Sequence, residues 1–204
     1  TLTGTTQIET ADFDGDGLPD LIIAGTVAAQ GAVQVLLNDG DGTFTGATAA
    51  NANDANNVIN QMALGDLNQD GELDVVIATD IAGGAEGLQI TGGDGDGTFT
   101  DGGATNDVFQ EEATESNDEL SHVLVADFDN DGIDDVVGFD TGNRLQFFEN
   151  TNATLDGNTL EDPVLANDVV ATAAISDMAV VDINKDGFLD IVTTRGANLG
   201  TYMN

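Results

Sequence analysis

Four short acidic runs share one pattern of oxygen-bearing side chains. They begin at residues 12, 66, 127 and 182, with Asp at positions 1, 5 and 9, Asp or Asn at position 3 and Gly at position 6. Calcium takes about six to eight oxygen ligands at roughly 2.3–2.6 Å, and Gly permits the sharp turn between them. The loops at 12–20, 66–74, 127–135 and 182–190 are therefore predicted to bind calcium, one ion each.

The segments on either side of each loop indicate β-strands. Runs such as 6–11 precede position 1, and short β-branched runs such as 21–24 follow position 9; these compositions are typical of buried strands. An EF-hand would instead need a Glu at position 12 and a helix on each side. In this chain position 12 is Ile23, Ile77, Gly138 or Thr193. Each loop is therefore predicted to join two strands.

The loops belong to a larger repeat. Their first acids lie 54 to 61 residues apart, a spacing at which repeat architectures are expected. A third strand-like run follows, as at 32–38 and 87–91, and Asp-Gly turns at 39–44 and 94–99 indicate a hairpin to a fourth strand. The predicted fold is all-β, with four repeats of about four antiparallel strands like the blades of a β-propeller. The calcium loop joins the first and second strands of each repeat.

Two motifs together resemble the FG-GAP/VCBS repeat, as in the amino-terminal propeller of integrin α subunits. They are Ala-Asp-Phe-Asp-Gly-Asp-Gly-Leu-Pro-Asp-Leu-Ile-Ile-Ala at 11–24 and Val-Leu-Leu-Asn-Asp-Gly-Asp-Gly-Thr-Phe at 35–44. The resemblance covers nearly the whole chain, although the Gly-Asp-Gly-Thr-Phe element occurs only in the first two repeats. It implies a calcium ion in each loop, held by the side chains at positions 1, 3, 5 and 9 and by the main-chain carbonyl of position 7.

Carried over position by position, the resemblance implies four sets of ligands. The first two sets are Asp12, Asp14, Asp16, Leu18 and Asp20, and Asp66, Asn68, Asp70, Glu72 and Asp74. The last two are Asp127, Asp129, Asp131, Ile133 and Asp135, and Asp182, Asn184, Asp186, Phe188 and Asp190. The position-7 residues would act through main-chain oxygen alone. Because the second and fourth sites have Asn at position 3 and carry less charge, we expect them to bind calcium more weakly.

The ends of the chain suggest how the repeats meet. Four blades are the lower end of known propellers. Residues 1–4 match residues 43–46, where a fourth strand begins. The last repeat, in contrast, stops after its third strand. The amino-terminal piece is therefore predicted to complete the last repeat. Two alternatives stay open: closure within one chain, or strand exchange through residues 1–6 that joins neighbours into oligomers or filaments.

Charge and composition exclude several functions. With 38 acids against 3 bases, the net charge is −35, so the clustered Lys and Arg that nucleic acids require are missing. Insertion in a membrane is not expected, since no apolar run has the necessary length. Without cysteine, calcium rather than a disulfide is predicted to hold the single repeat domain, residues 1–204, together. Millimolar extracellular calcium suits such loops, so an extracellular location is predicted.

No catalytic residues are predicted. A chain with no Cys and a single His, His122, offers neither a thiol mechanism nor a multi-His zinc site, and His122 is assigned a structural or surface role. Phe13, Phe128 and Phe188 in the loops are predicted to pack into the core. The predicted function is a structural or adhesive module; the alternative is a calcium-dependent carbohydrate- or protein-binding module. Sugar sites favour aromatic faces, and this chain has no Trp and one Tyr.

Overall fold

The computed structural model describes residues 3–27, 30–47, 50–51, 58–81, 85–100, 120–140, 145–150 and 175–202. The regular structure in these residues is β-strand throughout and forms four antiparallel sheets. The first sheet contains β1 (Thr3–Ala11), β2 (Asp20–Val27), β3 (Gln30–Asn38), β4 (Phe44–Gly46) and β5 (Ala50–Asn51). The second contains β6 (Val58–Gly65), β7 (Asp74–Ile81), β8 (Ala85–Gly93) and β9 (Phe99–Thr100).

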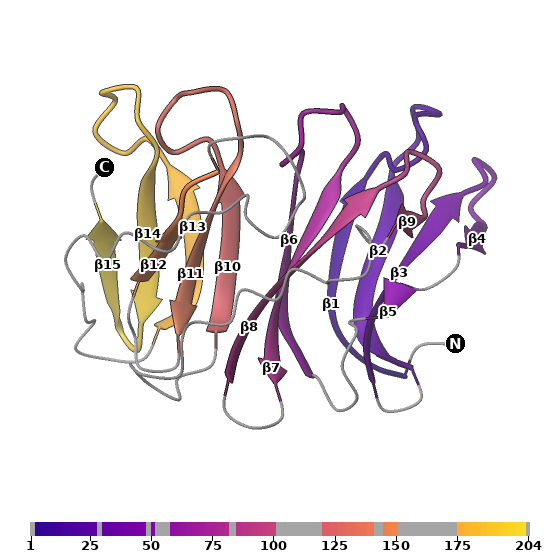
Figure 1. Ribbon diagram of the computed structural model, residues 1–204, viewed down its shortest axis with the longest axis horizontal. Coiled ribbons are helices and arrows are strands. Elements are labelled where there is room, and N and C mark those ends of the chain that lie inside the picture. Colours follow the sequence, from indigo (N-terminus) through magenta and orange to yellow (C-terminus); the bar gives the residue numbers. More distant parts are fainter. Residues whose placement is uncertain are drawn as a thin grey trace.

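The third and fourth sheets have three described strands each. The third contains β10 (Leu120–Ala126), β11 (Asp135–Asp140) and β12 (Leu145–Phe148), and the fourth contains β13 (Ile175–Val181), β14 (Asp190–Arg195) and β15 (Asn198–Tyr202). Neighbouring strands in each sheet follow chain order, except that β4 and β5 both pair with β3. Each acidic loop therefore joins the first and second strands of a sheet, as predicted, and all four loops project from the same end of the molecule (Figure 1).

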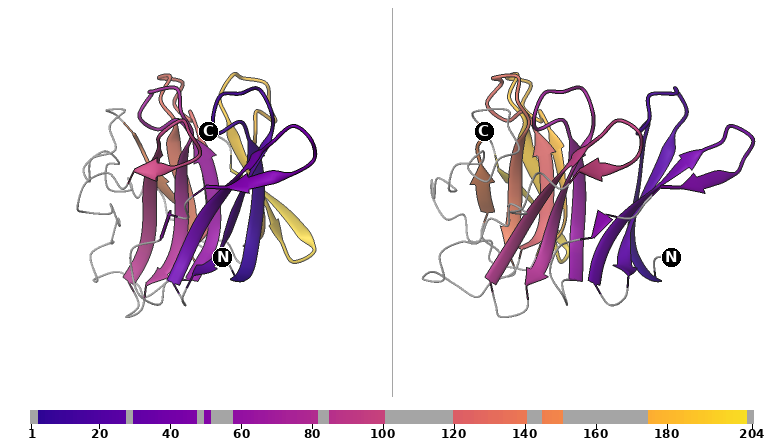
Figure 2. Two further views of the ribbon diagram at one scale, coloured as in Figure 1. Left: turned by 90° about the vertical axis from the view of Figure 1, so that its right-hand side faces the viewer. Right: turned by 45° about the vertical axis from the view of Figure 1, so that its right-hand side comes forward.

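The sheets stand face to face in chain order. Three apolar clusters join the first sheet to the second, the second to the third and the third to the fourth. Among the described residues, no such cluster joins the fourth sheet to the first. These two sheets lie at opposite ends of the row (Figure 1 and the right-hand view of Figure 2). The described residues therefore form a row of blade-like sheets, and closure of the row into a ring, one of the two alternatives that the sequence leaves open, is not shown among them.

Alternation along the second strand explains how each middle sheet is covered on both faces. On β7, Val75 and Ile77 pack against the first sheet, while Val76 and Ala78 pack against the third. Successive side chains of a strand point to opposite faces, so a strand with a neighbour on each side needs an uninterrupted apolar run. This is why the runs after position 9 do not alternate with polar residues.

Two expectations from the sequence are wrong. Residues 3–6 do not complete the last repeat, because Thr3 pairs with Thr26 and belongs to the same strand as Ala11. Phe13 and Phe128 are buried as expected, but Phe188 is exposed. The two buried rings stand at position 2 of their loops, which points into the space between sheets. Phe188 stands at position 7, on the outside of its loop. Residues 1–2 lie outside the described residues.

Candidate metal-binding loops

All four acidic loops are wound in the same way around their own carboxylates. In the first loop, Asp12 accepts the N–H of Gly17 at 2.9 Å, Asp14 accepts that of Asp16 at 3.2 Å, and Asp16 accepts that of Leu18 at 2.8 Å. The other three loops repeat these bonds at the same positions. Position 4 takes a left-handed backbone in each, as Gly15, Gln69, Asn130 and Lys185. The pattern of the sequence therefore fixes the backbone of each loop.

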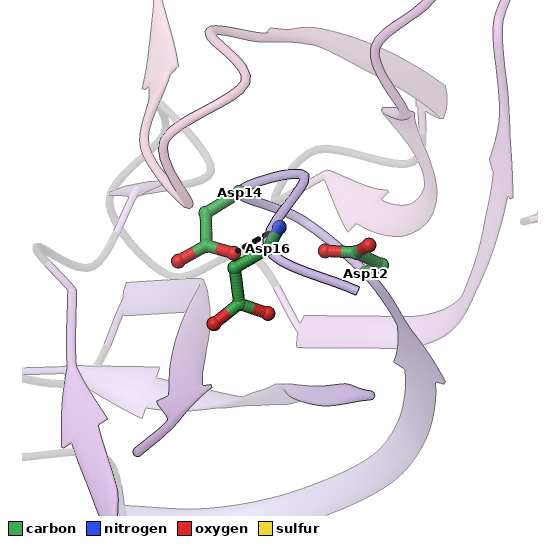
Figure 3. A group of neighbouring side chains, drawn as sticks. All are labelled: Asp12, Asp14 and Asp16. Carbon is green, nitrogen blue, oxygen red and sulfur yellow. Dashed lines mark hydrogen bonds between the residues drawn. The ribbon is translucent and has the colours of Figure 1, made fainter. Parts of the chain in front are cut away.

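Carboxylates converge in the first and third loops. One oxygen from each of Asp12, Asp14 and Asp16 lies within 4.8 Å of the others, and the three side chains gather inside the turn of the loop (Figure 3). A comparable group is formed by Asp127, Asp129 and Asp135. Like charges this close raise each other's energy unless protons or a cation compensate them. The first and third loops thus have the charge and the spacing to hold a metal ion.

The donor atoms fit a hard divalent cation. Each group consists of carboxylate oxygens, which suit calcium better than zinc or copper. Oδ1 of Asp127 is buried and has no hydrogen-bond donor among the described residues, although its Oδ2 accepts the N–H of Gly132 at 3.0 Å. A buried carboxylate oxygen without a partner is costly, and a cation in the third loop would supply the missing partner.

The second and fourth loops differ at position 3. The side-chain amide of Asn68 donates to Asp70 at 2.9 Å, and that of Asn184 donates to Asp186 at 2.8 Å. The amide thereby forms a hydrogen bond to one oxygen of the position-5 carboxylate. It also stands where the first and third loops have a negatively charged Asp. The second and fourth loops therefore carry less negative charge, and their position-5 carboxylates already have a hydrogen-bond donor without a metal ion.

The position-9 aspartates have a role within the sheets that the sequence pattern did not reveal. Asp74 accepts the N–H of Leu67 at 2.9 Å through Oδ2 and that of Gly93 at 3.0 Å through Oδ1. Asp20 and Asp135 make the same pair of bonds, to Phe13 and Asn38 and to Phe128 and Asn150. Each of these carboxylates therefore ties position 2 of its loop to the end of the third strand.

Burial of the position-9 side chains affects their ionisation. Asp74 and Asp135 are almost fully inaccessible to water. Burial raises the pKa of both to about 6, and the neighbouring loop carboxylates add to the shift, while the backbone N–H donors oppose it. A cation would favour the charged form of both groups. In the first loop, Asp20 lies outside the cluster formed by Asp12, Asp14 and Asp16.

Neighbouring loops also contact each other. Position 4 of one loop donates to the carbonyl of the position-6 glycine in the next: Gln69 to Gly132, and Asn130 to Gly187 at 3.0 Å. In addition, Asp134 accepts the N–H of Asp66 at 3.2 Å. The three later loops therefore form a connected row. The types of residue at position 4 differ, so this contact could not be predicted from the sequence.

The first strands of the four sheets line an open polar cavity of about 340 Å³. Its lining comprises Thr6, Gln7, Glu9, Asn60, Gln61, Ser121, His122, Ser176 and Asp177. Ser121 Oγ lies 2.9 Å from His122 Nδ1 and donates to the carbonyl of Phe139 at 3.0 Å. The hydroxyl of Ser121 is therefore held between the imidazole and a backbone carbonyl of the neighbouring strand. The two side chains meet because the strand is irregular between Leu120 and His122, so adjacency in the sequence did not predict their contact.

The FG-GAP-like repeat family matches three overlapping stretches of the chain, residues 12–77, 66–138 and 127–193. The matches run from the first acidic loop past the fourth, and the chain belongs to this family. FG-GAP repeats suggest a β-propeller-like module with an adhesive or structural role, which agrees with the blade-like sheets. No curated protein matches the chain. No helix among the described residues is long and apolar enough to cross a membrane.

Proposed function

We propose that this protein is an extracellular structural or adhesive module that calcium stabilises, with one ion in each of its four loops. The observation that carries the proposal is the convergence of three carboxylates in the first and third loops, together with the unpartnered buried oxygen of Asp127. The second and fourth loops share the backbone geometry and would bind more weakly. The family and its usual setting outside cells support the proposed location.

The side chains at positions 1, 3 and 5 would hold each ion, with position 9 contributing from the base of the loop. These positions in the first loop are Asp12, Asp14, Asp16 and Asp20. The bound ion would supply positive charge where carboxylates repel each other. The chain's own contribution is to fix the backbone of the loop and to anchor it to the sheet through position 9. The expected result is a stiffer junction between the first two strands.

We propose no catalytic role. The hydroxyl of Ser121 is held between the His122 imidazole and the Phe139 carbonyl, and this favours a structural role for the pair. A net charge of −35 argues against nucleic acids and anionic lipid surfaces as partners. Calcium is the partner for which the described residues offer the most support.

Thermal unfolding with and without a chelator tests calcium as the stabilising ion. A ligand that binds only the folded state stabilises it by about 2.7 kcal/mol per site at a hundredfold excess over its dissociation constant. Two occupied sites would therefore raise the midpoint by about 10 °C or more in a chain of this size. Chelation should lower the midpoint by that amount and excess calcium should restore it, whereas magnesium should not. Superimposable curves would contradict the proposal.

The polar cavity favours a second candidate, a carbohydrate- or protein-binding module. Its amide, hydroxyl and carboxylate groups match the hydrogen-bonding groups of a sugar. A glycan array probed in calcium and in chelator tests this candidate. Binding that Gln61→Ala and Asp177→Ala abolish would favour it, and an absence of glycan binding in both conditions would exclude carbohydrate.

A further inference from the structure

The two end sheets expose apolar residues whose counterparts in other sheets are buried or partly buried. Ile8 stands four residues before its loop, as do Met62, Val123 and Met178 in the other repeats. Those three are buried, while Ile8 is 58% exposed. Ile8 and Ile23 also line an open, mainly apolar hollow of about 270 Å³ on the first sheet. We call this side of the first sheet, with Ile8, Ile23 and Phe44, the leading face.

The fourth sheet has the opposite uncovered side. Ile183 stands at position 2 of its loop and is 50% exposed, whereas Phe13, Leu67 and Phe128 at the same position are buried against the next sheet. Leu199 is 74% exposed. Leu199 pairs with the fifth residue of β14. The residues at the same place in the first and second sheets are Val33 and Leu88, and both side chains are buried.

We call this side of the fourth sheet, with Ile183, Leu199 and Val181, the trailing face. Trailing and leading faces already pack together three times inside the chain. Where the first sheet meets the second, Phe13 and Ile22 of one trailing face share a cluster with Met62 and Ile77 of the next leading face. The uncovered trailing face of the fourth sheet and the uncovered leading face of the first sheet are therefore the two halves of the same contact.

Charge adds to this complementarity. Gln69 and Asn130, at position 4 of their loops, each donate to the position-6 glycine carbonyl of the following loop. Position 4 of the last loop is Lys185, with the same left-handed backbone as Asn130. The corresponding acceptor on a leading face is the carbonyl of Gly17, in the loop where Asp12, Asp14 and Asp16 gather. One of the three bases in the chain thus stands where the acidic first loop of the neighbour would lie.

We propose that the leading face of a second copy of this chain docks on the trailing face of the first. Among the described residues, the chain's own leading face lies at the opposite end of the row from its trailing face (Figure 2), and a second copy offers the same leading face that the trailing faces of the first three sheets already contact. The contact uses different surfaces on the two copies, and repetition of such a contact builds an open filament or a ring of several copies. This inference goes beyond the proposed function and does not require a strand to be exchanged.

Paired variants that block one face each provide the test. Ile8→Glu blocks the leading face and Leu199→Glu blocks the trailing face; both residues are exposed, so both variants should fold. Asn198→Glu is the matched control, because it adds the same charge to the adjacent, exposed residue on the other side of the same strand. Mass in solution is measured by analytical ultracentrifugation over a range of concentrations, in excess calcium and again in chelator with high salt.

We expect the unmodified chain and Asn198→Glu to grow in mass with concentration, while each blocked variant alone stays at the mass of one copy. An equimolar mixture of the two blocked variants should give dimers and nothing larger, since one intact face remains on each. Ile183→Glu should behave like Leu199→Glu. An unmodified chain that stays monomeric in both solutions overturns the proposal in favour of closure within the chain. Self-association of Ile8→Glu alone overturns it in favour of pairing between like faces.

Discussion

Two kinds of aspartate make up each loop, and the structure separates their tasks. The position-5 side chains, such as Asp70, are exposed and accept one backbone N–H inside the loop. The position-9 side chains, such as Asp74, are buried and hold two backbone N–H groups from different parts of the sheet. The exposed residue is suited to the ion and the buried one to the fold. Their substitutions should therefore depend on calcium in different ways.

Asp74→Ala is expected to destabilise the protein with or without calcium. It would leave the N–H groups of Leu67 and Gly93 unpaired near the core, at a cost of about 2 to 4 kcal/mol. Asp70→Ala should lower stability in calcium by a comparable amount but change it little in chelator. Urea unfolding of both variants in both solutions checks this. A loss for Asp74→Ala that disappears in chelator would show that position 9 acts only through the ion.

Asn68→Asp is expected to strengthen the second site. It adds a carboxylate to the loop and removes the amide that occupies Asp70. An added charge next to the ion should increase calcium affinity about tenfold, or by about 1.4 kcal/mol. Isothermal titration calorimetry of the variant, with Asn184→Asp as the matched change in the fourth loop, measures the effect. Unchanged or weaker calcium binding would mean that the charge at position 3 does not determine which loops bind calcium more tightly.

At the scale of elements, irregular first strands connect one sheet to the next. The pairing of β1 with β2 shifts before Gln7, and that of β6 with β7 shifts before Gln61. Gln7 then exchanges two hydrogen bonds with the backbone of Met62, at 2.7 and 3.0 Å, and Gln61 accepts the N–H of Val123 at 2.7 Å. A bulge re-aims a side chain, and here the re-aimed amides join the sheets at their inner edges.

Gln7→Ala is expected to weaken the junction between the first two sheets. It removes two bonds and leaves the N–H of Met62 without its acceptor, which should cost about 1 to 2 kcal/mol of unfolding free energy. Gln7→Glu is the control, because it keeps an acceptor for that N–H but loses the donor to the Met62 carbonyl. Denaturant unfolding should rank Gln7→Ala below Gln7→Glu, and both below the unmodified chain. Equal stability of the three would show that apolar packing alone joins these sheets.

The strands and loops could be predicted from the sequence because their signals are local. Positions 1 to 9 fix the acidic turn, and β-branched runs such as 75–78 indicate strands buried on both faces. The contacts between repeats could not be predicted. The amide of Gln7 reaches Met62, 55 residues away, and its aim depends on a bulge with no distinct residue type. Thr3 and Gly4 were misassigned because the match of residues 1–4 with 43–46 says nothing about which sheet pairs with them.

At the scale of the whole molecule, one direction of packing runs through the row. Each of the first three sheets presents a trailing face to the leading face of the next, and within the described part of the chain the two ends of the row expose apolar residues. A charge of −35 opposes the approach of further copies, and bound calcium would reduce that repulsion. Calcium in the loops and docking of the end faces should therefore support each other, with the loops all on one side of any assembly.

Counting calcium ions on the protein tests the central claim most directly. The chain is dialysed to equilibrium against calcium, and bound metal is measured for the unmodified protein, Asp16→Ala and Asp70→Ala. We expect four ions per chain, with two bound more tightly than the other two. We also expect three ions in each variant, with a tight site missing in Asp16→Ala and a weak one in Asp70→Ala. No bound calcium above that of a chelated sample, or an unchanged count in both variants, would contradict the account.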